Sequence, residues 1–199
     1  MKLKLTHYKK NLSSNELSMI LNHVKDDVKY RLIFKIMAYI GLRIGEVSRI
    51  KRNDIQGDFE TLRVELEKSH KIVERVIPES LKEDFMEYLE KYPSKEEYLF
   101  LPDGRSDNKY LQVTSIRWKF YKVIKESGLD DTYYHRRDGK PLFRISPHTL
   151  RHYFVTQFYN HSSYDLLLTK EVIGHKKLDT TLMYISPRNL EREIINKIF

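Results

Sequence analysis

Cysteine is absent from this chain of 199 residues. Without a thiol the protein forms no disulfide, uses no cysteine nucleophile and offers no cysteine-ligated zinc site. Long apolar runs are lacking too: the longest, around residues 32–42, is interrupted by Lys35 and is too short to cross a bilayer. The N-terminus also lacks the apolar core of a signal peptide. We therefore predict a soluble, intracellular protein with no membrane partner.

Linkers and repeats are equally scarce. The sequence contains no internal repeat, no low-complexity tract and no Pro- or Gly-rich connector. One compact domain is expected over residues 12–186, with a basic leader at 1–11 and a C-terminal tail helix at 187–199. The apolar stripe of that tail begins at Leu190 and is a candidate protomer interface. The formal net charge of +8 makes a polyanion such as DNA or RNA the natural partner.

Hydrophobic periodicity predicts a mainly helical fold with one small antiparallel β-hairpin. Ser13 and Glu16 form a capping-box pattern before a first amphipathic helix. Gly41 is the expected end of a second, more buried helix. Residues 61–66 and 72–77 are rich in β-branched and aliphatic side chains and predict the two strands of the hairpin.

The second half of the chain is expected to be helical around one long loop. Helices are predicted at 80–92, at 113–127 and from Ser146-Pro147 onward, and the loop is predicted at 130–144. Within the second of these helices, Trp118 and Phe120 follow an amphipathic pattern that predicts core packing for both.

One predicted helix carries a face of chemically active side chains. His148, Arg151 and His152 fall at i, i+3 and i+4, so they lie along one side of the helix. Two histidines four residues apart could bind a metal ion, but a fixed arginine beside a dication is electrostatically unfavourable. The face is better suited to gripping a phosphate through bidentate guanidinium hydrogen bonds. A solvated or core-capping helix face is the plain alternative.

Five short motifs occur in a fixed order along the chain. They are Gly41-Leu42-Arg43-Ile44-Gly45-Glu46-Val47, the hairpin lysines, His148-Thr149-Leu150-Arg151-His152, Gly174-His175 and Leu182-Met183-Tyr184. In order and approximate spacing this set resembles the catalytic domain of the tyrosine recombinase (phage-type integrase) family, over nearly the whole chain. The resemblance implies that family's fold and DNA strand transfer without a metal ion, ATP or any other cofactor.

The resemblance also implies a role for each matching residue. Arg43 and Arg151 would clamp the scissile phosphate, while His148 and His175 would bond its non-bridging oxygens. Tyr184 would attack phosphorus, giving a 3′-phosphotyrosyl link and a free 5′-hydroxyl. The residue types suit this task, because a free tyrosine has a pKa near 10, which leaves a deficit of about 4 kcal/mol at pH 7. Flanking guanidinium groups favour the phenolate and the pentavalent charge.

The lysine that would protonate the departing oxygen has two candidates. Strand alternation puts Lys68 on the face of Val64 and Leu66, which favours it over Lys71. A charged turn without a catalytic role is the alternative for both. Glu46 matches an acidic position that supports the active site. Contacts to the DNA backbone are expected from Arg75, Arg136, Arg137 and Lys140, and a supporting role is open to His152; ordinary surface charge is their alternative.

The expected partner is double-stranded DNA. Only about a dozen residues precede the first predicted helix, so we expect this chain to lack the family's usual helical core-binding domain, either as a minimal enzyme or as a catalytic fragment. In both cases DNA binding should be weaker and less sequence-specific than that of a two-domain enzyme. We expect a monomer in solution that assembles on DNA as a homo-oligomer, a tetramer. The expected setting is the cytoplasm or nucleoid of a prokaryotic host, with a virus, plasmid or other mobile element as a candidate source.

Three other functions are open to the same residues. A type IB topoisomerase shares the tyrosine, arginine and lysine chemistry but relaxes DNA. A non-catalytic DNA-binding protein could keep the fold without the reaction. A metal-dependent nuclease built on His148 and His152 is the third.

Overall fold

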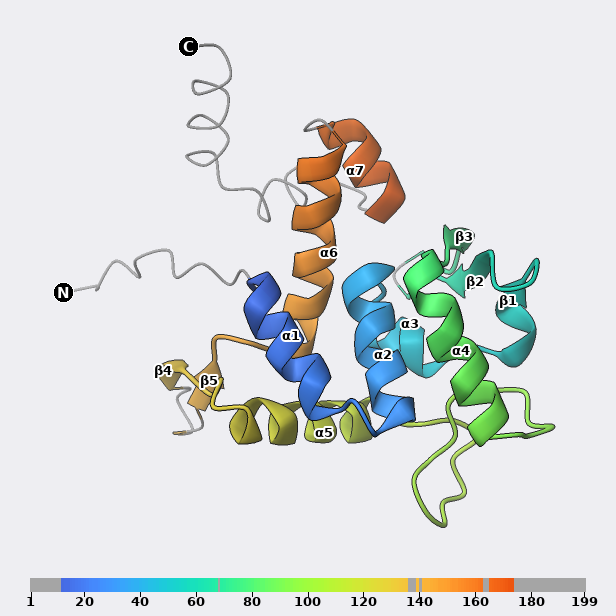
Figure 1. Ribbon diagram of the computed structural model, residues 1–199, viewed down its shortest axis with the longest axis horizontal. Helices are drawn as coiled ribbons and strands as arrows, with labels where there is room; N and C mark the ends of the chain where they lie inside the picture. Colours follow the sequence, from blue (N-terminus) through green and yellow to red (C-terminus); the bar gives the residue numbers. More distant parts are fainter. Residues whose placement is uncertain (1–11, 68, 136–138, 140, 163–164, 174–199) are drawn as a thin grey trace.

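The computed structural model describes residues 12–67, 69–135, 139, 141–162 and 165–173, and within these ranges the chain is mainly helical (Figure 1). The α-helices are α1 Ser14–His23, α2 Val28–Tyr39, α3 Ile44–Ser48, α4 Glu79–Lys91, α5 Val113–Glu126, α6 Pro147–His161 and α7 Leu166–Ile173, with a 3-10 turn η1 at Arg52–Asp54. The strands are β1 Ile55–Gln56, β2 Thr61–Glu65, β3 Ile72–Val76, β4 Thr132–His135 and β5 Pro141–Phe143. Among the described helices, none combines the length and the apolar character needed to cross a membrane.

The first helix begins where its capping box predicts. The Ser13 hydroxyl accepts the backbone N–H of Glu16 at 3.2 Å, and the Glu16 carboxylate accepts the backbone N–H of Ser13 at 2.8 Å. These two hydrogen bonds satisfy two of the backbone N–H groups that have no acceptor within the helix at its start. The helix then buries Leu17 and Ile20 in the core.

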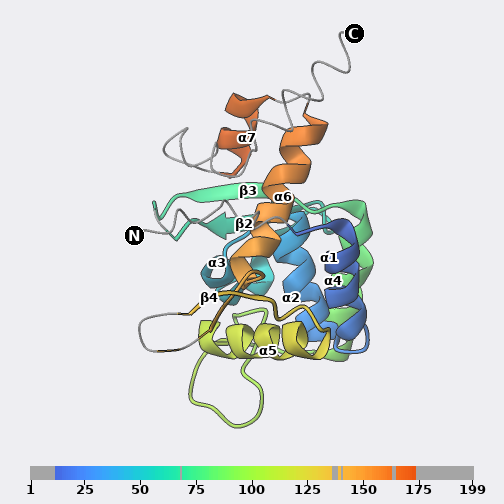
Figure 2. The ribbon, with the colours of Figure 1, turned by 90° about the vertical axis from the view of Figure 1, so that its left-hand side faces the viewer.

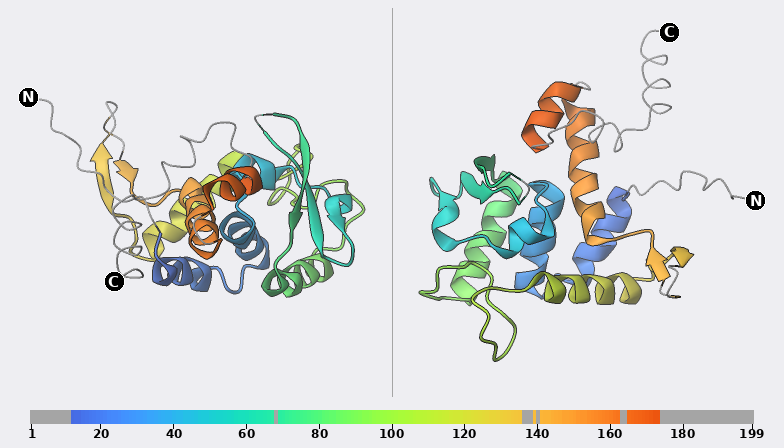
Figure 3. Two further views of the ribbon diagram at one scale, coloured as in Figure 1. Left: turned by 90° about the horizontal axis from the view of Figure 1, so that it is seen from above. Right: turned by 180° about the vertical axis from the view of Figure 1, so that it is seen from behind.

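Helix α2 forms the centre of the core. Six of its side chains are at most 1% exposed: Leu32, Ile33, Phe34, Ile36, Met37 and Ala38. The helix packs against α4 on one side and α6 on the other (Figures 1 and 3). A helix that is apolar over most of its circumference is stable only in such a position. Because α2 leads directly to Gly41 and Arg43, the best-packed element of the domain anchors the predicted site.

The predicted hairpin is present and gains one short strand. β2 pairs with β3 in antiparallel register, and β1 adds to the other edge of β2. Leu62 and Val64 point into the core, while Arg63 and Glu65 are exposed, which is the alternation expected of a sheet with one buried face. β1 is only two residues long and carries no sequence pattern of its own.

The prediction of a long loop at 130–144 is wrong. Part of this segment forms the two-stranded sheet of β4 and β5, in which Thr132 pairs with Phe143. Both strands are labelled in Figure 1, and β4 is labelled again in Figure 2. The segment's many polar and basic residues resemble a loop, but strand formation depends on a pairing partner farther along the chain as well as on local composition. Figures 1 and 3 show this small sheet at the opposite end of the molecule from β1, β2 and β3.

The core prediction holds for Phe120 but is wrong for Trp118. Phe120 is fully buried, whereas Trp118 is 66% exposed. The buried face of α5 is set by Ile116, Phe120 and Val123, and a residue two positions from Ile116 is rotated by about 200° on a helix. The Nζ atom of Lys122 lies 5.6 Å from the Trp118 ring centroid, so a cation covers part of the exposed indole.

Candidate active site

Arg43 stands at the junction between α2 and α3. The chain leaves α2 through Gly41, whose φ of +77° is a conformation that side chains with a Cβ rarely adopt. A Cβ at this position would also lie 2.2 Å from Cδ1 of Phe154 on α6. Arg43 follows as the N-cap of α3 in an extended conformation, and its side chain is 14% exposed. Glycine at position 41 therefore permits both the turn and the close approach of α6.

Glu46 holds this junction together from inside α3. Its buried carboxylate accepts the backbone N–H of Arg43 at 2.8 Å and the Nη1 of the same residue at 2.8 Å. The backbone N–H of Glu67, in the hairpin turn, also donates to it at 3.3 Å. Burial raises the pKa of Glu46, but the Arg43 backbone, the charge of Arg151 and the Arg43 guanidinium together hold it below its ordinary value. The carboxylate is therefore ionised and faces two arginines.

Arg151 approaches the same carboxylate from α6. That helix begins at Pro147 after Ser146, as the sequence predicts, and Arg151 lies in its second turn. The guanidinium is 2% exposed; its Nη1 donates to the carbonyl oxygen of Gly41 at 2.6 Å and lies 3.7 Å from Oε2 of Glu46. Two arginines that are more than a hundred residues apart in sequence are thus brought together around one glutamate.

A cavity of about 600 Å³ opens beside this cluster. Arg43 and His148 both line it, so two of the predicted phosphate ligands face one space. His148 is exposed at the start of α6, and its ring lies edge-on to that of His152, with centroids 4.7 Å apart.

Two residues that the sequence analysis did not single out line the same cavity. Arg117 comes from α5, and Glu67 comes from the hairpin turn. A Cβ on Gly45 would lie 2.7 Å from the Glu67 Oε1, so the turn packs closely onto the start of α3. The basic residues on the exposed face of α5 could have indicated Arg117 as a candidate. Only the packing of α5 against α3 brings that face to the cavity.

The hairpin residues are only partly described. Val64 and Leu66, whose strand face was predicted to include Lys68, are buried and point toward the core. Lys68 itself lies outside the described residues. Lys71 is exposed, and its carbonyl oxygen accepts the Leu66 N–H at 2.9 Å to close the turn. The choice between the two lysines stays a prediction.

Several other predicted positions lie outside the described residues as well. They are Arg136, Arg137, Lys140, His175 and Tyr184, together with the leader at 1–11 and the tail at 187–199. Their proposed roles stay predictions.

The described part of the site is suited to binding an anion. Two guanidinium groups face one carboxylate, which leaves an excess positive charge beside an open cavity. Both arginines are held in place before any ligand arrives, which is the arrangement that stabilises developing negative charge most effectively. Among the described residues, no group of three or more His, Asp or Glu side chains is placed to hold a metal ion.

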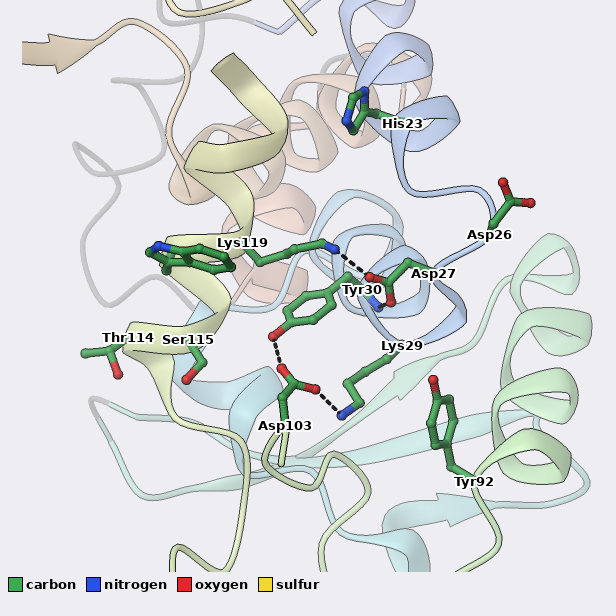
Figure 4. A pocket seen from close by; sticks show the side chains of 11 residues that line it. His23, Asp26, Asp27, Lys29, Tyr30, Tyr92, Asp103, Thr114, Ser115 and Lys119 are labelled. Atoms are coloured by element: carbon green, nitrogen blue, oxygen red, sulfur yellow. Dashed lines mark hydrogen bonds and ion pairs between the residues drawn. The ribbon is translucent and has the colours of Figure 1, made fainter. Parts of the chain in front are cut away.

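A second, larger pocket of about 1050 Å³ lies at the opposite end of α2 (Figure 4). Its two lysines pair with two of its aspartates, and Asp26 adds a further negative charge: Asp103 accepts from Lys29 at 2.7 Å and from Tyr30 at 2.5 Å, and Lys119 lies 2.6 Å from Asp27. Because the paired charges neutralise each other within the pocket, it offers much weaker attraction to an anion than the smaller cavity beside Arg43.

Comparison with known proteins shows the family of this chain. The family model described as the phage integrase family matches residues 10–191. The chain is 28% identical over 176 residues to the tyrosine recombinase XerA of Pyrococcus furiosus, which covers 88% of this chain and 56% of that protein. It is 30% identical over 187 residues to the tyrosine recombinase XerC of Proteus mirabilis, covering 89% and 55%. The chain thus spans about half the length of these relatives.

Solved structures share the fold. The crystal structure of XerA recombinase superposes with a TM-score of 0.75 at 22% identity, covering 94% of this chain and 64% of that one. The XerH site-specific recombinase bound to palindromic difH substrate, in a post-cleavage complex, gives 0.69 at 24% identity, covering 95% and 53%. The predicted fold class, mainly α with a small antiparallel sheet, is confirmed.

Proposed function

This chain belongs to the phage integrase family, and on that premise we propose that it cleaves and rejoins DNA strands through a 3′-phosphotyrosyl intermediate, as the catalytic part of a site-specific recombinase. The observation that carries the proposal is the ionised Glu46 between Arg43 and Arg151, beside a cavity that His148 also lines. Each preorganised donor of this kind contributes roughly 10²–10³ in rate when charge develops on a bound oxyanion.

The reaction needs a phosphate ligand set, a nucleophile and an acid. Arg43 and Arg151 neutralise the non-bridging oxygens, and His148 and His175 donate to them. The Tyr184 hydroxyl loses its proton to solvent, and its oxygen forms a bond to phosphorus as the bond from phosphorus to the 5′ oxygen breaks. A hairpin lysine, for which we favour Lys68, supplies the proton that the departing 5′ oxygen takes up. Because the new phosphodiester retains the energy of the old one, rejoining runs the same steps backward without ATP.

The DNA substrate is double-stranded, and several basic side chains of the protein contact its phosphate backbone. Arg75, Arg136, Arg137 and Lys140 are the proposed contacts. A protein that releases counterions from this many phosphates should lose affinity steeply as salt rises. We propose a monomer in solution that assembles as a tetramer on DNA, with the apolar stripe of the tail helix at the interface. Light scattering that finds a stable tetramer without DNA would contradict this assembly.

A nicked suicide duplex tests the chemistry directly. When the nick lies close to the cleavage site, the short 5′-hydroxyl fragment diffuses away and the covalent adduct accumulates. The adduct is expected with wild type and lost with Tyr184→Phe. Tyr110→Phe is the matched control, because the Tyr110 hydroxyl makes no hydrogen bond among the described residues. An adduct that persists in the Tyr184 variant would rule out that nucleophile.

Two further assays separate the proposal from its rivals. Recombination between paired sites is expected, whereas supercoil relaxation without exchange would indicate a topoisomerase. Adduct formation should be unchanged by a chelator; cleavage that a chelator abolishes would indicate the nuclease chemistry of His148 and His152 instead.

A further inference from the structure

Arg75 of β3 points toward the same side of the sheet as the core. In the antiparallel register Arg75 lies directly opposite Leu62, and Val73 lies opposite Val64. Residues opposite one another in neighbouring strands project from the same face. Leu62 and Val64 are 0% and 3% exposed, so their face is the buried one. A guanidinium on the buried face is unusual, because every second residue of an edge strand faces solvent, where a charged side chain stays hydrated.

Two charged residues of the candidate active site act electrostatically on Arg75. Burial lowers the pKa of Arg75, the carboxylate of Glu46 raises it and the guanidinium of Arg43 lowers it, and the net effect is a pKa below the ordinary value. Arg75 is therefore close enough to both residues to interact with them electrostatically. Its own guanidinium makes no hydrogen bond and no ion pair with the described residues. The five N–H donors of this half-buried cation have no acceptor among the described residues.

Such an arrangement leaves Arg75 ready to bind an anion. Burial is the largest influence on the pKa of Arg75, and together with the repulsion of Arg43 it outweighs the attraction of Glu46, so the cation is poorly stabilised in the free protein. Glu46 is already occupied by Arg43 and the Glu67 backbone. A negatively charged ligand bound beside the Arg43 guanidinium would supply the partner that Arg75 lacks among the described residues.

We infer that Arg75 is a third arginine of the phosphate site, and that the backbone phosphate it contacts is the same phosphodiester that Arg43 binds. The inference depends on the proposed function only for the identity of the anion as the DNA phosphate at which Tyr184 reacts. Anion binding by itself can be tested without any strand transfer.

Arg63 provides a matched control on the neighbouring strand. It is exposed on the opposite face of the same sheet, paired in register with Glu74. Arg75→Gln and Arg63→Gln remove the same charge. Without ligand, Arg75→Gln should melt at or above the wild-type temperature, because it removes a partly desolvated cation that makes no ion pair with the described residues. Arg63→Gln should leave the melting temperature unchanged. A structural role for Arg75 would instead lower it.

The first arm of the experiment uses inorganic phosphate. Thermal melts of the full chain are recorded with phosphate and with an equal ionic strength of chloride. Binding to the native state raises the melting temperature. Wild type and Arg63→Gln should show the same phosphate-specific rise, and Arg75→Gln should show a smaller one. An equal rise in all three proteins overturns the inference, whether or not the wild type proves able to cleave DNA.

The second arm uses the nicked suicide duplex in two forms, one with a normal scissile phosphate and one with an uncharged methylphosphonate there. On the normal duplex Arg75→Gln should form adduct about 100-fold more slowly than Arg63→Gln, the effect of losing one preorganised donor. Arg75→Lys should recover part of the rate. On the methylphosphonate the difference between the glutamine variants should shrink severalfold, because the charge that Arg75 neutralises is gone.

The outcomes separate the two proposals. A wild type without any adduct defeats the proposed function, and the phosphate melts still decide the role of Arg75. An adduct in wild type with equal rates in Arg75→Gln and Arg63→Gln defeats only the third-arginine inference. The same holds if the Arg75→Gln defect is equally large on the methylphosphonate.

Discussion

Replacing Glu46 by glutamine tests the central feature of the site. The variant keeps the size of the side chain and an acceptor for Arg43, but it removes the charge that faces two guanidinium groups. Arg151 is 2% exposed, so its charge cannot be re-solvated without disturbing α6. Breaking one partner out of a buried ion pair costs about 3–5 kcal/mol, and the lower end suits a variant that retains a hydrogen bond. For a domain of this size that is a fall of about 6–12 °C in melting temperature.

The same substitution should change the pH dependence of stability. Because the pKa of Glu46 is lowered in the folded protein, its ionised form stabilises the fold above the ordinary carboxyl value of 4.5. That contribution is lost as pH falls through the folded-state pKa. The difference between wild type and Glu46→Gln should therefore be full at neutral pH and should narrow below about pH 4.5.

Urea unfolding across this pH range, followed by circular dichroism, measures both effects. Glu90→Gln is the control, since Glu90 is exposed on α4 and makes no ion pair with the described residues. Adduct formation at a temperature where the variant is folded should fall about 100-fold, because the arginines lose their common anchor. A melting temperature within about 2 °C of wild type, with an unchanged acid limb, would refute the bridging role.

Three other substitutions test neighbouring features. Gly41→Ala should destabilise the fold by about 3 kcal/mol in urea unfolding, because it adds a clash with Phe154 to the strain of a positive φ. Gly128→Ala, which has open space around a φ of +67°, should cost only about 1 kcal/mol. Equal losses in the two variants would contradict the close approach of α6 to Gly41. Asp84→Asn should cost about 3 kcal/mol, because it leaves Lys35 of α2 without its ion pair to α4 and leaves Arg31 paired with Glu87 alone, and a neutral result would contradict this. Glu67→Gln should tighten binding to short duplex DNA by about threefold beyond the gain of Glu90→Gln, because it removes a carboxylate from the cavity that Arg43 lines; equal gains in a salt-matched titration would contradict that.

Some elements were predictable because their signals are local. The capping box of Ser13 and Glu16 acts over one helical turn, and the hairpin follows from two β-rich stretches close in sequence. The loop predicted at 130–144 failed because the pairing of β4 with β5 depends on residues that meet only in the folded chain. The core prediction for Trp118 failed because the pattern around it indicates an amphipathic helix without showing which side of that helix is buried. The packing of neighbouring elements decides that side.

The sequence by itself determined which residues are available for phosphate chemistry, since Arg43, His148 and Arg151 stand in motifs whose order and spacing can be read directly. Only the tertiary structure decided how they are held. Gly41 allows α6 to reach the end of α2, and Glu46 then meets both arginines. The inward direction of Arg75 likewise follows from strand register. These relations join segments far apart in the chain, so they depend on packing and on electrostatics at short distance, which no local pattern records.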